Sequence, residues 1–353
     1  MNNHLVIMAG GVGSRFWPMS TPECPKQFID VMGCGRTFIQ LTLDRFRGIV
    51  PNENVWVVTS ESYRDIVREQ LPDISPDHIL LEPCRRNTAP CIAYVSWRIK
   101  QIAPDANLII TPSDHIVTDV IEFQRVMRLA LDFTSSNDAI LTLGMKPTRP
   151  ETGYGYIERV KDVTDGICAD GAIYKVAQFR EKPNLETAKQ YISQPEFYWN
   201  SGIFVWNVRT IVSQLKLHAP EVTAVFDRLN PYLGTDKEQE MVNQLFPTCP
   251  SISIDYAVME KAQEIYVCPA DFGWSDVGTW GSLITLSQKD AEGNATIGPR
   301  IEMHECANCI VHTSEEKRVV VQGLDGYIVA EKDGTLLICK LSEEQRIKEF
   351  SAE

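Results

Sequence analysis

Short segments that are apolar throughout alternate along the chain with longer segments of helical pattern, and this alternation constrains the fold more than any other feature. The apolar segments are residues 5–9, 55–58, 79–81, 108–111 and 139–143. Strands that are apolar at every position are typical of a parallel sheet buried on both faces. Helical segments lie between them at residues 38–46 and 88–102, and we expect Thr88 to cap the second helix, with Pro90 in its first turn. The pattern predicts an α/β fold with a mainly parallel central sheet, whose ligands bind at the carboxyl ends of the strands.

The pattern changes near Asp290. Glycines then separate short β-rich runs such as residues 319–321 and 336–338, and a helical pattern returns only at residues 342–350. We therefore predict two domains, a main domain of residues 1–288 and a small β-rich C-terminal extension of residues 289–353.

The charge balance limits the classes of function. The 353 residues carry a net charge of -13, which is opposite to the basic face of a nucleic-acid-binding protein. An anionic substrate must therefore be met by local cations or a metal, because the overall field repels it. No apolar run has the length of about 20 residues that spans a membrane, and no basic segment precedes residues 5–9 as in a signal peptide. We expect a cytoplasmic protein with ten reduced cysteines and neither a membrane nor a nucleic-acid partner.

A glycine-rich turn follows the first predicted strand. It contains Gly10, Gly11 and Gly13, and Arg15 follows it. Glycines allow backbone N–H groups to approach phosphate oxygens, and an arginine adds a bidentate cation. The spacing is neither that of a Walker A loop nor that of a dinucleotide-binding loop, so a plain strand-to-loop turn is the alternative. Lys26, in segment 25–28, brings a second cation that can reach the same phosphates.

Segments 10–18 and 25–28 together resemble a known signature. Gly-Gly-x-Gly-x-Arg-x-x-Pro followed by Pro-Lys is similar to the signature of the sugar-1-phosphate nucleotidyltransferases, and the fuller forms here resemble the mannose-1-phosphate guanylyltransferases in particular. Segments 82–90, 111–115, 199–204 and 272–280 support the same family. Phe16 stands where that family often has leucine, and Arg85 stands where it usually has a small residue. The resemblance covers roughly residues 4–285 and implies a Rossmann-like layered nucleotidyltransferase domain.

The reaction that this resemblance implies transfers GMP from GTP to mannose 1-phosphate, giving GDP-mannose and pyrophosphate. The sugar phosphate, with a second pKa of about 6, is largely a dianion near neutral pH. It can therefore attack the α-phosphorus in line without a side-chain nucleophile. Repulsion between two anions is the obstacle, so the cations Arg15 and Lys26 are the candidate catalytic residues.

Two carboxylates from distant segments are candidate metal ligands. Asp114 follows a predicted buried strand, and Asp276 lies in a loop bounded by glycine and tryptophan. Mg²⁺ takes few protein ligands and fills its remaining positions with phosphate oxygens and water. The alternative for each residue is a helix N-cap, for the helices before Ile121 and at residues 279–286. The resemblance implies that both aspartates bind Mg²⁺.

Glu82 is the candidate for recognition of the base. Guanine presents two adjacent donors on its pairing edge, and a carboxylate accepts both, whereas uracil and thymine offer an acceptor there. Charge-assisted hydrogen bonds contribute roughly 1.5–3 kcal/mol each. An exposed strand-end glutamate is the alternative. Asn87 and Thr88 stand at the start of the next predicted helix, where backbone N–H groups can also meet the nucleotide.

The sugar phosphate needs hydroxyl-binding groups and a cation. Gly155 in segment 152–156 allows close backbone approach, Glu181 and Lys182 supply an acceptor and a cation, and Asn200 supplies both a donor and an acceptor. In related enzymes these segments line the sugar-phosphate site, and tight turns are the alternative. Asp255 is predicted to be a cap or first-turn acid of the following helix, with a site-lining role second.

Three other functions compete with this hypothesis. A glucose-1-phosphate thymidylyl- or uridylyltransferase is disfavoured by Glu82 and segment 86–90. A catalytically silent regulatory subunit that binds GDP-mannose should have lost Lys26 or one of the aspartates Asp114 and Asp276, and this chain keeps all three. A glycosyltransferase would need an Asp-x-Asp motif after a strand, and the sequence has none after the predicted strands.

Two further features bear on metals and domains. His304, Cys306, Cys309 and His312 have the side-chain types of a zinc site, but the gaps between them are narrower than in zinc fingers, and we interpret them as structural. Larger family members carry a C-terminal isomerase domain, for which this chain ends too soon, so we expect no mannose-6-phosphate isomerase activity. The sequence leaves the oligomeric state open, with a homodimer as one candidate.

Overall fold

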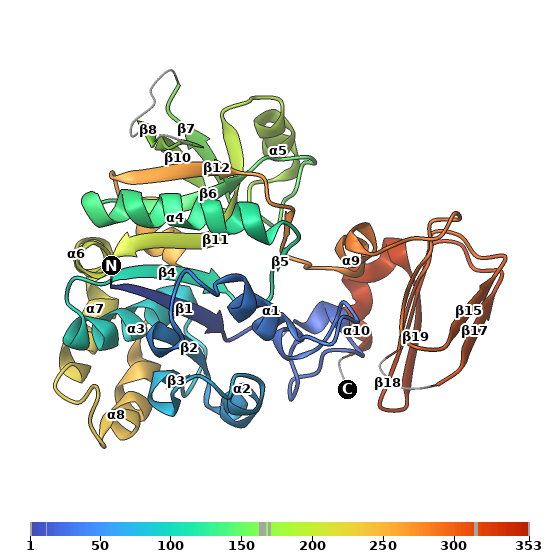
Figure 1. Cartoon of the computed structure of the whole chain (residues 1–353), viewed down its shortest axis with the longest axis horizontal. Coiled ribbons are helices and arrows are strands. Elements are labelled where there is room, and N and C mark those ends of the chain that lie inside the picture. Colours follow the sequence, from blue (N-terminus) through green and yellow to red (C-terminus); the bar gives the residue numbers. More distant parts are fainter. Residues whose placement is uncertain (1, 12, 162–166, 169–170, 314–316, 352–353) are drawn as a thin grey trace. The chain divides into compact units, whose positions relative to one another are not determined.

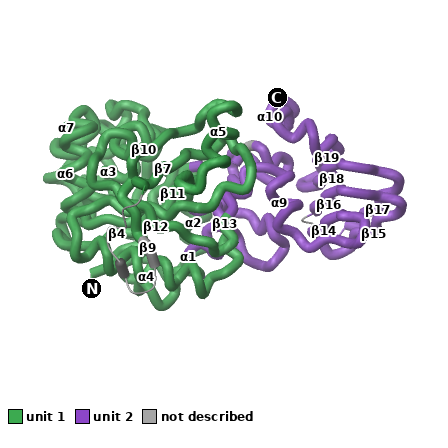
Figure 2. Tube along the Cα trace, turned by 90° about the horizontal axis from the view of Figure 1, so that it is seen from above, with its two compact units in different colours: residues 1–10, 45–112, 117–274 green, residues 11–44, 113–116, 275–353 purple. Residues whose placement is uncertain are grey.

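A nine-stranded mixed sheet dominates the computed structural model, which describes residues 2–11, 13–161, 167–168, 171–313 and 317–351. The chain divides into two compact units (Figure 2). Unit 1 comprises Met1–Gly10, Arg45–Pro112 and Val117–Trp274, and unit 2 comprises Gly11–Asp44, Ser113–Ile116 and Ser275–Glu353. Unit 2 therefore joins residues from the start and the end of the chain. The two domains expected at residues 1–288 and 289–353 are consecutive in the sequence, unlike these units, and that division stays a prediction.

The sheet of unit 1 has the strand order β3-β2-β1-β4-β11-β6-β12-β10-β7 (Figure 1). Its strands are β1 (Asn3–Ala9), β2 (Val55–Ser60), β3 (Ile79–Glu82), β4 (Asn107–Pro112), β6 (Ile140–Met145), β7 (Tyr156–Arg159), β10 (Tyr174–Arg180), β11 (Phe197–Asn207) and β12 (Ile265–Ala270). The five strands predicted from apolar segments are confirmed as β1, β2, β3, β4 and β6, and nearly all of their residues are buried. An α/β fold follows.

The sheet, expected to be mainly parallel, is mixed, because two of its nine strands run against the others. β11 pairs antiparallel with β4, β6 and β7, and β10 pairs antiparallel with β12 and β7. The other pairings described in this sheet are parallel. β11 has no continuous apolar run in its first half, where Asn200, Ser201 and Gly202 interrupt it, and the sequence pattern therefore did not predict it.

The helices of unit 1 are α2 (Arg64–Gln70), α3 (Thr88–Ile102), α4 (Val120–Ser136), α5 (Leu185–Ile192), α6 (Val208–His218), α7 (Pro220–Leu229) and α8 (Glu238–Leu245). Most of these helices contact the sheet, and α7 packs on other helices. Helix α4 contacts β4, β6, β11 and β12, while α3, α6 and α7 pack together in a large apolar cluster that includes Trp56 and Trp206. The predicted helix 88–102 is confirmed, but its N-cap is Asn87, not Thr88, because the Asn87 Oδ1 accepts from the Thr88 N–H.

Unit 2 is built from the glycine-rich turn, short helices and a small set of strands. The short helices are the 3₁₀ turns η1 (Ser14–Phe16) and η2 (Lys26–Phe28), then α9 (Trp280–Leu286), η8 (Leu341–Arg346) and α10 (Ile347–Phe350). Helix α1 (Phe38–Arg45) ends at the border with unit 1 and confirms the helix expected at residues 38–46. The helix expected at residues 342–350 is split into η8 and α10.

The late strands of unit 2 are mostly parallel. They are β14 (Ala295–Ile297), β15 (Ile301–His304), β16 (Ile310–Thr313), β17 (Val319–Gln322), β18 (Tyr327–Lys332) and β19 (Thr335–Lys340). β14, β16 and β18 pair in parallel, β19 adds an antiparallel hairpin, and β15 pairs with β17. An apolar core joins Phe16 and Phe38 from the first part of the unit to Trp280 and Ile328 from the last part. Two short pairs complete the fold, β5 (Ile116–Val117) with β13 (Trp274–Ser275) and β8 (Ile167–Cys168) with β9 (Gly171–Ala172).

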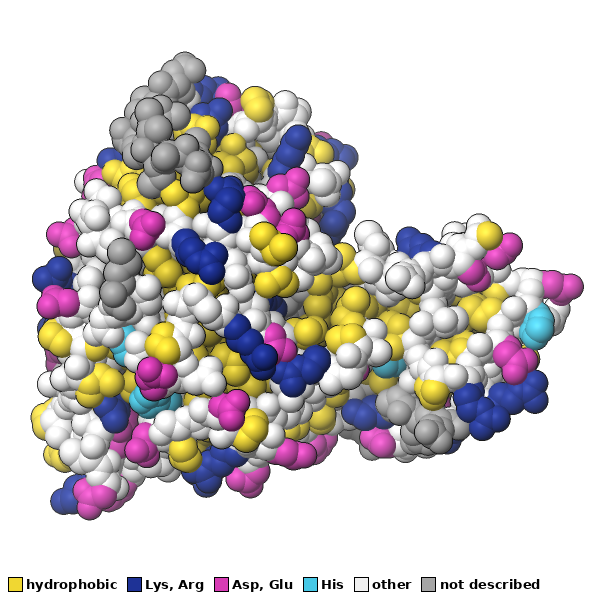
Figure 3. Space-filling model, viewed as in Figure 1, with side chains coloured by type: hydrophobic (Ala, Val, Ile, Leu, Met, Phe, Trp, Pro, Cys, Tyr) yellow, Lys and Arg dark blue, Asp and Glu magenta, His cyan; other side chains and the backbone are white. Residues whose placement is uncertain are grey.

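The surface charges and the cysteines also bear on the expectations from the sequence. Acidic and basic side chains are interspersed over the face drawn in Figure 3. Within the described ranges, no helix combines the length and the apolar character that crossing a bilayer requires. The cysteines whose side chains are described are free thiols.

Candidate active site

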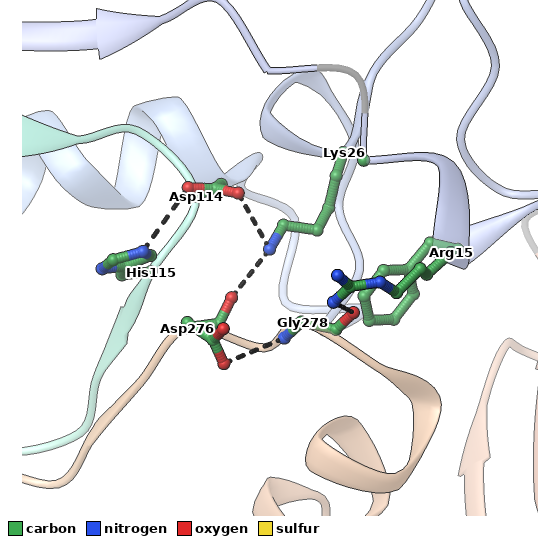
Figure 4. A pocket seen from close by; sticks show the side chains of 8 residues that line it. Arg15, Lys26, Asp114, His115, Asp276 and Gly278 are labelled. Carbon is green, nitrogen blue, oxygen red and sulfur yellow. Dashed lines mark hydrogen bonds and ion pairs between the residues drawn. The ribbon is translucent and has the colours of Figure 1, made fainter. Parts of the chain in front are cut away.

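One pocket in unit 2 gathers the charged residues that the sequence singled out. It has a volume of about 250 Å³ and is lined by Gly13, Arg15, Phe16, Lys26, Asp114, His115, Asp276 and Gly278 (Figure 4). Three stretches of chain supply these residues, and all three belong to unit 2. Arg15, Lys26, Asp114 and Asp276 are thus brought together, although up to 261 positions separate them in the sequence.

Lys26 lies at the centre of this pocket. Its Nζ is 3.0 Å from the Asp114 Oδ2 and donates to the carbonyl oxygens of Asp276 at 2.8 Å and Val277 at 3.1 Å. An ammonium group has three N–H donors, so these three oxygens satisfy it. Its side chain is only 4% exposed, and the rings of Phe16 and Phe38 lie 5.7 and 5.3 Å from the nitrogen. The ammonium is therefore held in a cage of oxygens and aromatic faces.

Asp114 faces this ammonium from the loop after β4. Burial alone would raise the pKa of Asp114, but the charges of Lys26 and His115 outweigh burial and lower the pKa below its usual value. The His115 Nε2 is 3.8 Å from the Asp114 Oδ1. The alternative role of Asp114 as a helix N-cap is wrong, because Asp119 caps α4 by accepting from the Glu122 N–H.

Asp276 and Arg15 meet around Gly278. The Asp276 Oδ1 accepts from the Gly278 N–H at 3.1 Å, and the Arg15 Nη1 donates to the Gly278 carbonyl at 3.2 Å. A Cβ at Gly278 would lie 2.9 Å from the Asp276 Oδ2, so only glycine fits without displacement. The N-cap of α9 is Thr279, which excludes the alternative that Asp276 caps this helix.

The glycine-rich turn is fixed by its carbonyl groups. The Gln27 Nε2 donates to the Gly11 carbonyl at 2.8 Å, and the Ser20 Oγ donates to the Gly13 carbonyl at 2.6 Å. Gly13 has a φ of 57°, and a Cβ there would collide with the Cβ of Lys26. Gly13 therefore meets a conformational and a steric requirement at once.

The donor set in this pocket fits the expected divalent ion. Asp114 and Asp276 line the same cavity, and two carboxylates with room for phosphate oxygens and water are a chemically suitable set for Mg²⁺. In the described part of the chain, no group of three or more His, Cys, Asp or Glu side chains forms a metal site without a substrate. The remaining ligands would therefore have to come from the substrate and the solvent.

Glu82 stands at the end of β3 in unit 1. It is 7% exposed, which excludes the alternative of an exposed strand-end glutamate, and its Oε1 is a buried acceptor without a hydrogen-bond partner. Burial raises the pKa of Glu82 to about 8, although contact with the Cys91 thiol partly lowers it. A Cβ at Gly10 would lie 3.7 Å from the Glu82 Oε2, so the end of the glycine-bearing strand adjoins this carboxyl group.

The start of α3 is held by contacts within the protein. The Thr88 N–H is bound by the Asn87 Oδ1, and the Ala89 N–H donates to the Ile252 carbonyl at 3.1 Å. The Thr88 hydroxyl accepts from the Ile254 N–H at 2.8 Å. These two N–H groups are bound within the protein, and the expected contacts of Asn87 and Thr88 with the nucleotide stay a prediction.

The four sugar-phosphate candidates form a second cluster in unit 1. The Lys182 Nζ is 2.8 Å from the Glu181 Oε1, and the Asn200 N–H donates to the Gly155 carbonyl at 2.8 Å. A Cβ at Gly155 would lie 2.6 Å from the Glu181 Oε2, so this glycine permits the close approach. The Asn200 Nδ2 donates to Asp255, an acid in the first turn of the π-helix Asp255–Met259. Burial and then the charge of Glu181 raise the pKa of Asp255 to about 6.

Several residues beside these clusters were not predicted. His115, Gln27 and Ser20 carry no pattern that separates them from ordinary loop residues. In unit 1, the Tyr154 ring packs edge-on against Trp199 and Trp274, with centroids 5.2 and 5.3 Å apart, next to Gly155. The abundance of aromatic residues around segments 154–156, 199–204 and 272–280 was the available signal.

His304, Cys306, Cys309 and His312, the residues with side chains of a zinc-binding type, have different surroundings in the structure. His304 is exposed, and the Sγ atoms of Cys306 and Cys309 each contact two backbone carbonyls. The buried His312 ring lies against Trp280, and its Nε2 is 3.1 Å from the Val31 carbonyl.

Comparison with known proteins gives the family. A model of the nucleotidyl transferase family matches residues 4–293. The chain therefore belongs to the nucleotidyl transferase family and is an enzyme. It is 36% identical over 351 residues to a mannose-1-phosphate guanylyltransferase from Escherichia coli, covering 97% of this chain and 74% of the relative. It is 38% identical over 347 residues to mannose-1-phosphate guanylyltransferase RfbM from Salmonella typhimurium, covering 93% and 69%.

A solved structure is similar over the whole chain. The structure described as mannose-1-phosphate geranyltransferase from Thermus thermophilus has a TM-score of 0.87 and 29% sequence identity, and the match covers 99% of this chain and 98% of that one.

Proposed function

We propose that this chain transfers GMP from GTP to mannose 1-phosphate, releasing pyrophosphate and giving GDP-mannose. The pocket that unites Arg15, Lys26, Asp114 and Asp276 is the observation that carries the proposal. Two cations and two carboxylates in one cavity are the set that transfer between two phosphorylated anions requires. The curated relatives named as mannose-1-phosphate guanylyltransferases support the choice of substrates.

The protein's own part in the reaction is positioning and charge neutralisation. Arg15, from the glycine-rich turn, presents a guanidinium to the triphosphate, and the turn supplies its backbone N–H groups. The Lys182 ammonium holds the phosphate of the sugar, and Glu181 accepts from a sugar hydroxyl. Asn200 accepts from the Thr142 hydroxyl and the Gly202 N–H and donates to Asp255, so it positions this cluster. Mannose 1-phosphate attacks the α-phosphorus with an oxygen that is already ionised, so no side chain needs to remove a proton.

A divalent ion completes the charge balance. Held by Asp114 and Asp276, Mg²⁺ would neutralise negative charge on the phosphates. These two side chains are kept in place by Lys26 and by the Gly278 N–H, respectively.

Glu82 gives the base specificity in this proposal. Its Oε1 is buried and has no hydrogen-bond partner. A ligand that donates a hydrogen bond to this oxygen is therefore bound more tightly than one that does not. Guanine brings two such donors. A nucleotide without them would leave this oxygen unsatisfied.

The experiment is pyrophosphate release, measured with GTP and mannose 1-phosphate, with and without Mg²⁺. We expect release only with both substrates and the metal. A panel in which GTP is replaced by UTP, dTTP or ATP, and mannose 1-phosphate by glucose 1-phosphate, tests the specificity. Equal or faster release with another base or sugar would overturn the assignment.

The remaining expectations accompany this proposal. A Rossmann-like layering of the main domain, a C-terminal extension from residue 289, a cytoplasmic location and a homodimer stay predictions.

A further inference from the structure

The three oxygens around the Lys26 ammonium are also good ligands for a hard metal cation. They are one carboxylate oxygen, from Asp114, and the two backbone carbonyl oxygens of Asp276 and Val277, all within 3.1 Å of the nitrogen. Carboxylate and carbonyl oxygens are the groups that hard cations prefer. The cage therefore selects a cation, and the Lys26 ammonium occupies it.

Backbone strain accompanies this cage. Val277 has a φ of 43°, which is rare for a β-branched residue, and its side chain is fully buried. A residue in such a conformation persists only when its surroundings compensate for it, and strained residues of this kind cluster at functional sites. Here the strained residue, Val277, supplies one of the two consecutive carbonyl oxygens that accept from the ammonium.

We propose that Lys26 acts as a stand-in cation, so that a divalent ion must compete with the Lys26 ammonium for the Asp114 carboxylate. Two cations on one carboxylate repel each other, and the Lys26 side chain, at 4% exposure, is little screened by water. The ammonium then leaves Asp114 when the ion binds, and the triphosphate of the nucleotide offers it a new partner. Lys26 thereby couples metal binding to nucleotide binding, and by reciprocity each strengthens the other.

This inference rests on the proposed function, which assigns Asp114 as a metal ligand. The test uses the metal alone, without nucleotide or sugar, and counts free Mn²⁺ by electron paramagnetic resonance. We compare the wild type with Lys26→Met, which keeps an unbranched side chain of similar length and removes the charge. We expect Lys26→Met to bind Mn²⁺ at least about tenfold more tightly, because the competing cation is gone.

Two further variants separate competition from a general change of charge. Lys332→Met removes an ammonium elsewhere in unit 2, where the Lys332 Nζ donates to the Met19 carbonyl at 2.8 Å, and we expect it to leave Mn²⁺ affinity unchanged. The double variant, which combines Lys26→Met with Asp114→Asn, should bind Mn²⁺ no more tightly than Asp114→Asn alone, because the contested carboxylate is absent from both. An affinity of folded Lys26→Met equal to or weaker than that of the wild type would overturn the proposal, as would a gain that survives in the double variant.

A measurement on the wild type covers the case in which Lys26→Met does not fold. Acetylation of lysines by acetic anhydride, followed by mass spectrometry, reports how accessible each ammonium is. We expect Lys26 to be protected without metal and several-fold more reactive with saturating Mn²⁺. Unchanged or lower reactivity would contradict the displacement. Neither measurement includes GTP, so their failure leaves guanylyl transfer standing, whereas failure of pyrophosphate release would refute the transfer itself.

Discussion

Replacement of Glu82 by glutamine should remove the part of the pH dependence of GTP binding that arises from ionisation of this residue. In the ligand-free protein, burial raises the pKa of Glu82 to about 8, so the neutral form predominates below that pH. Guanine donates two hydrogen bonds and therefore favours the ionised form. Binding of GTP must then release a proton from Glu82, and GTP affinity should rise with pH up to about 8 and level off above it.

The magnitude follows from the fraction of ionised Glu82. With a pKa of about 8, the need to ionise first weakens binding about a hundredfold at pH 6, about elevenfold at pH 7 and about twofold at pH 8. GTP affinity should therefore rise about fiftyfold between pH 6 and pH 8. Because the triphosphate titrates in the same range, the useful quantity is the ratio of the wild-type affinity to the Glu82→Gln affinity, in which that titration cancels.

Isothermal titration calorimetry gives both readouts. Titrations in two buffers of different ionisation enthalpy at pH 7 should show release of about 0.9 proton per GTP bound by the wild type. Glu82→Gln should show none from this residue and should discriminate less between GTP and ATP. A ratio that is flat from pH 6 to pH 8, or equal proton release by the two proteins, would refute the reasoning that a buried carboxylate reads the guanine.

Three more predictions follow from the geometry. Asp276→Asn should lower turnover at least about 100-fold in a pyrophosphate-release assay while thermal unfolding changes little, and near-normal turnover would remove Asp276 from the site. Gly13→Ala should lower the free energy of unfolding in urea by about 1–3 kcal/mol, because the φ of Gly13 is positive and a Cβ there would collide with Lys26. The control Gly11→Ala should lower it less, because a Cβ at Gly11 would have nothing within 4 Å. Equal losses in the two variants would contradict the steric argument. The pKa of the buried His4 is lowered to about 4 by burial and by His78, so the unfolded chain takes up a proton near pH 6.5 that the folded chain refuses. Stability should fall as the pH drops from about 6.5 toward 4, by up to roughly 1.4 kcal/mol per pH unit, and His4→Gln, whose amide oxygen can still accept from the Trp56 Nε1, should flatten that dependence.

Local patterns predicted the parts of the fold that local forces determine. The strands β1, β2, β3, β4 and β6 each contain a predominantly apolar run, which is typical of strands that are buried on both faces. Helix α3 was predicted with an error of one residue at its N-cap, because its periodic apolar face and Pro90 are local signals. The reversed strands β10 and β11 were not predicted, because strand direction depends on which neighbours a strand meets across the sheet.

The candidate site divides in the same way. The sequence by itself determined which residues carry charge and which turns need glycine: Arg15, Lys26 and Gly13 stand in a short motif whose chemistry is legible without coordinates. It also determined that Glu82 ends a strand, but not that its Oε1 is buried without a partner, since burial depends on packing from α3 and its neighbours. Only the tertiary structure decided that the Lys26 ammonium is satisfied by Asp114, Asp276 and Val277, because these contacts join residues up to 251 positions apart. No local pattern encodes such a distance, and the contact exists only when the two ends of unit 2 pack into one core.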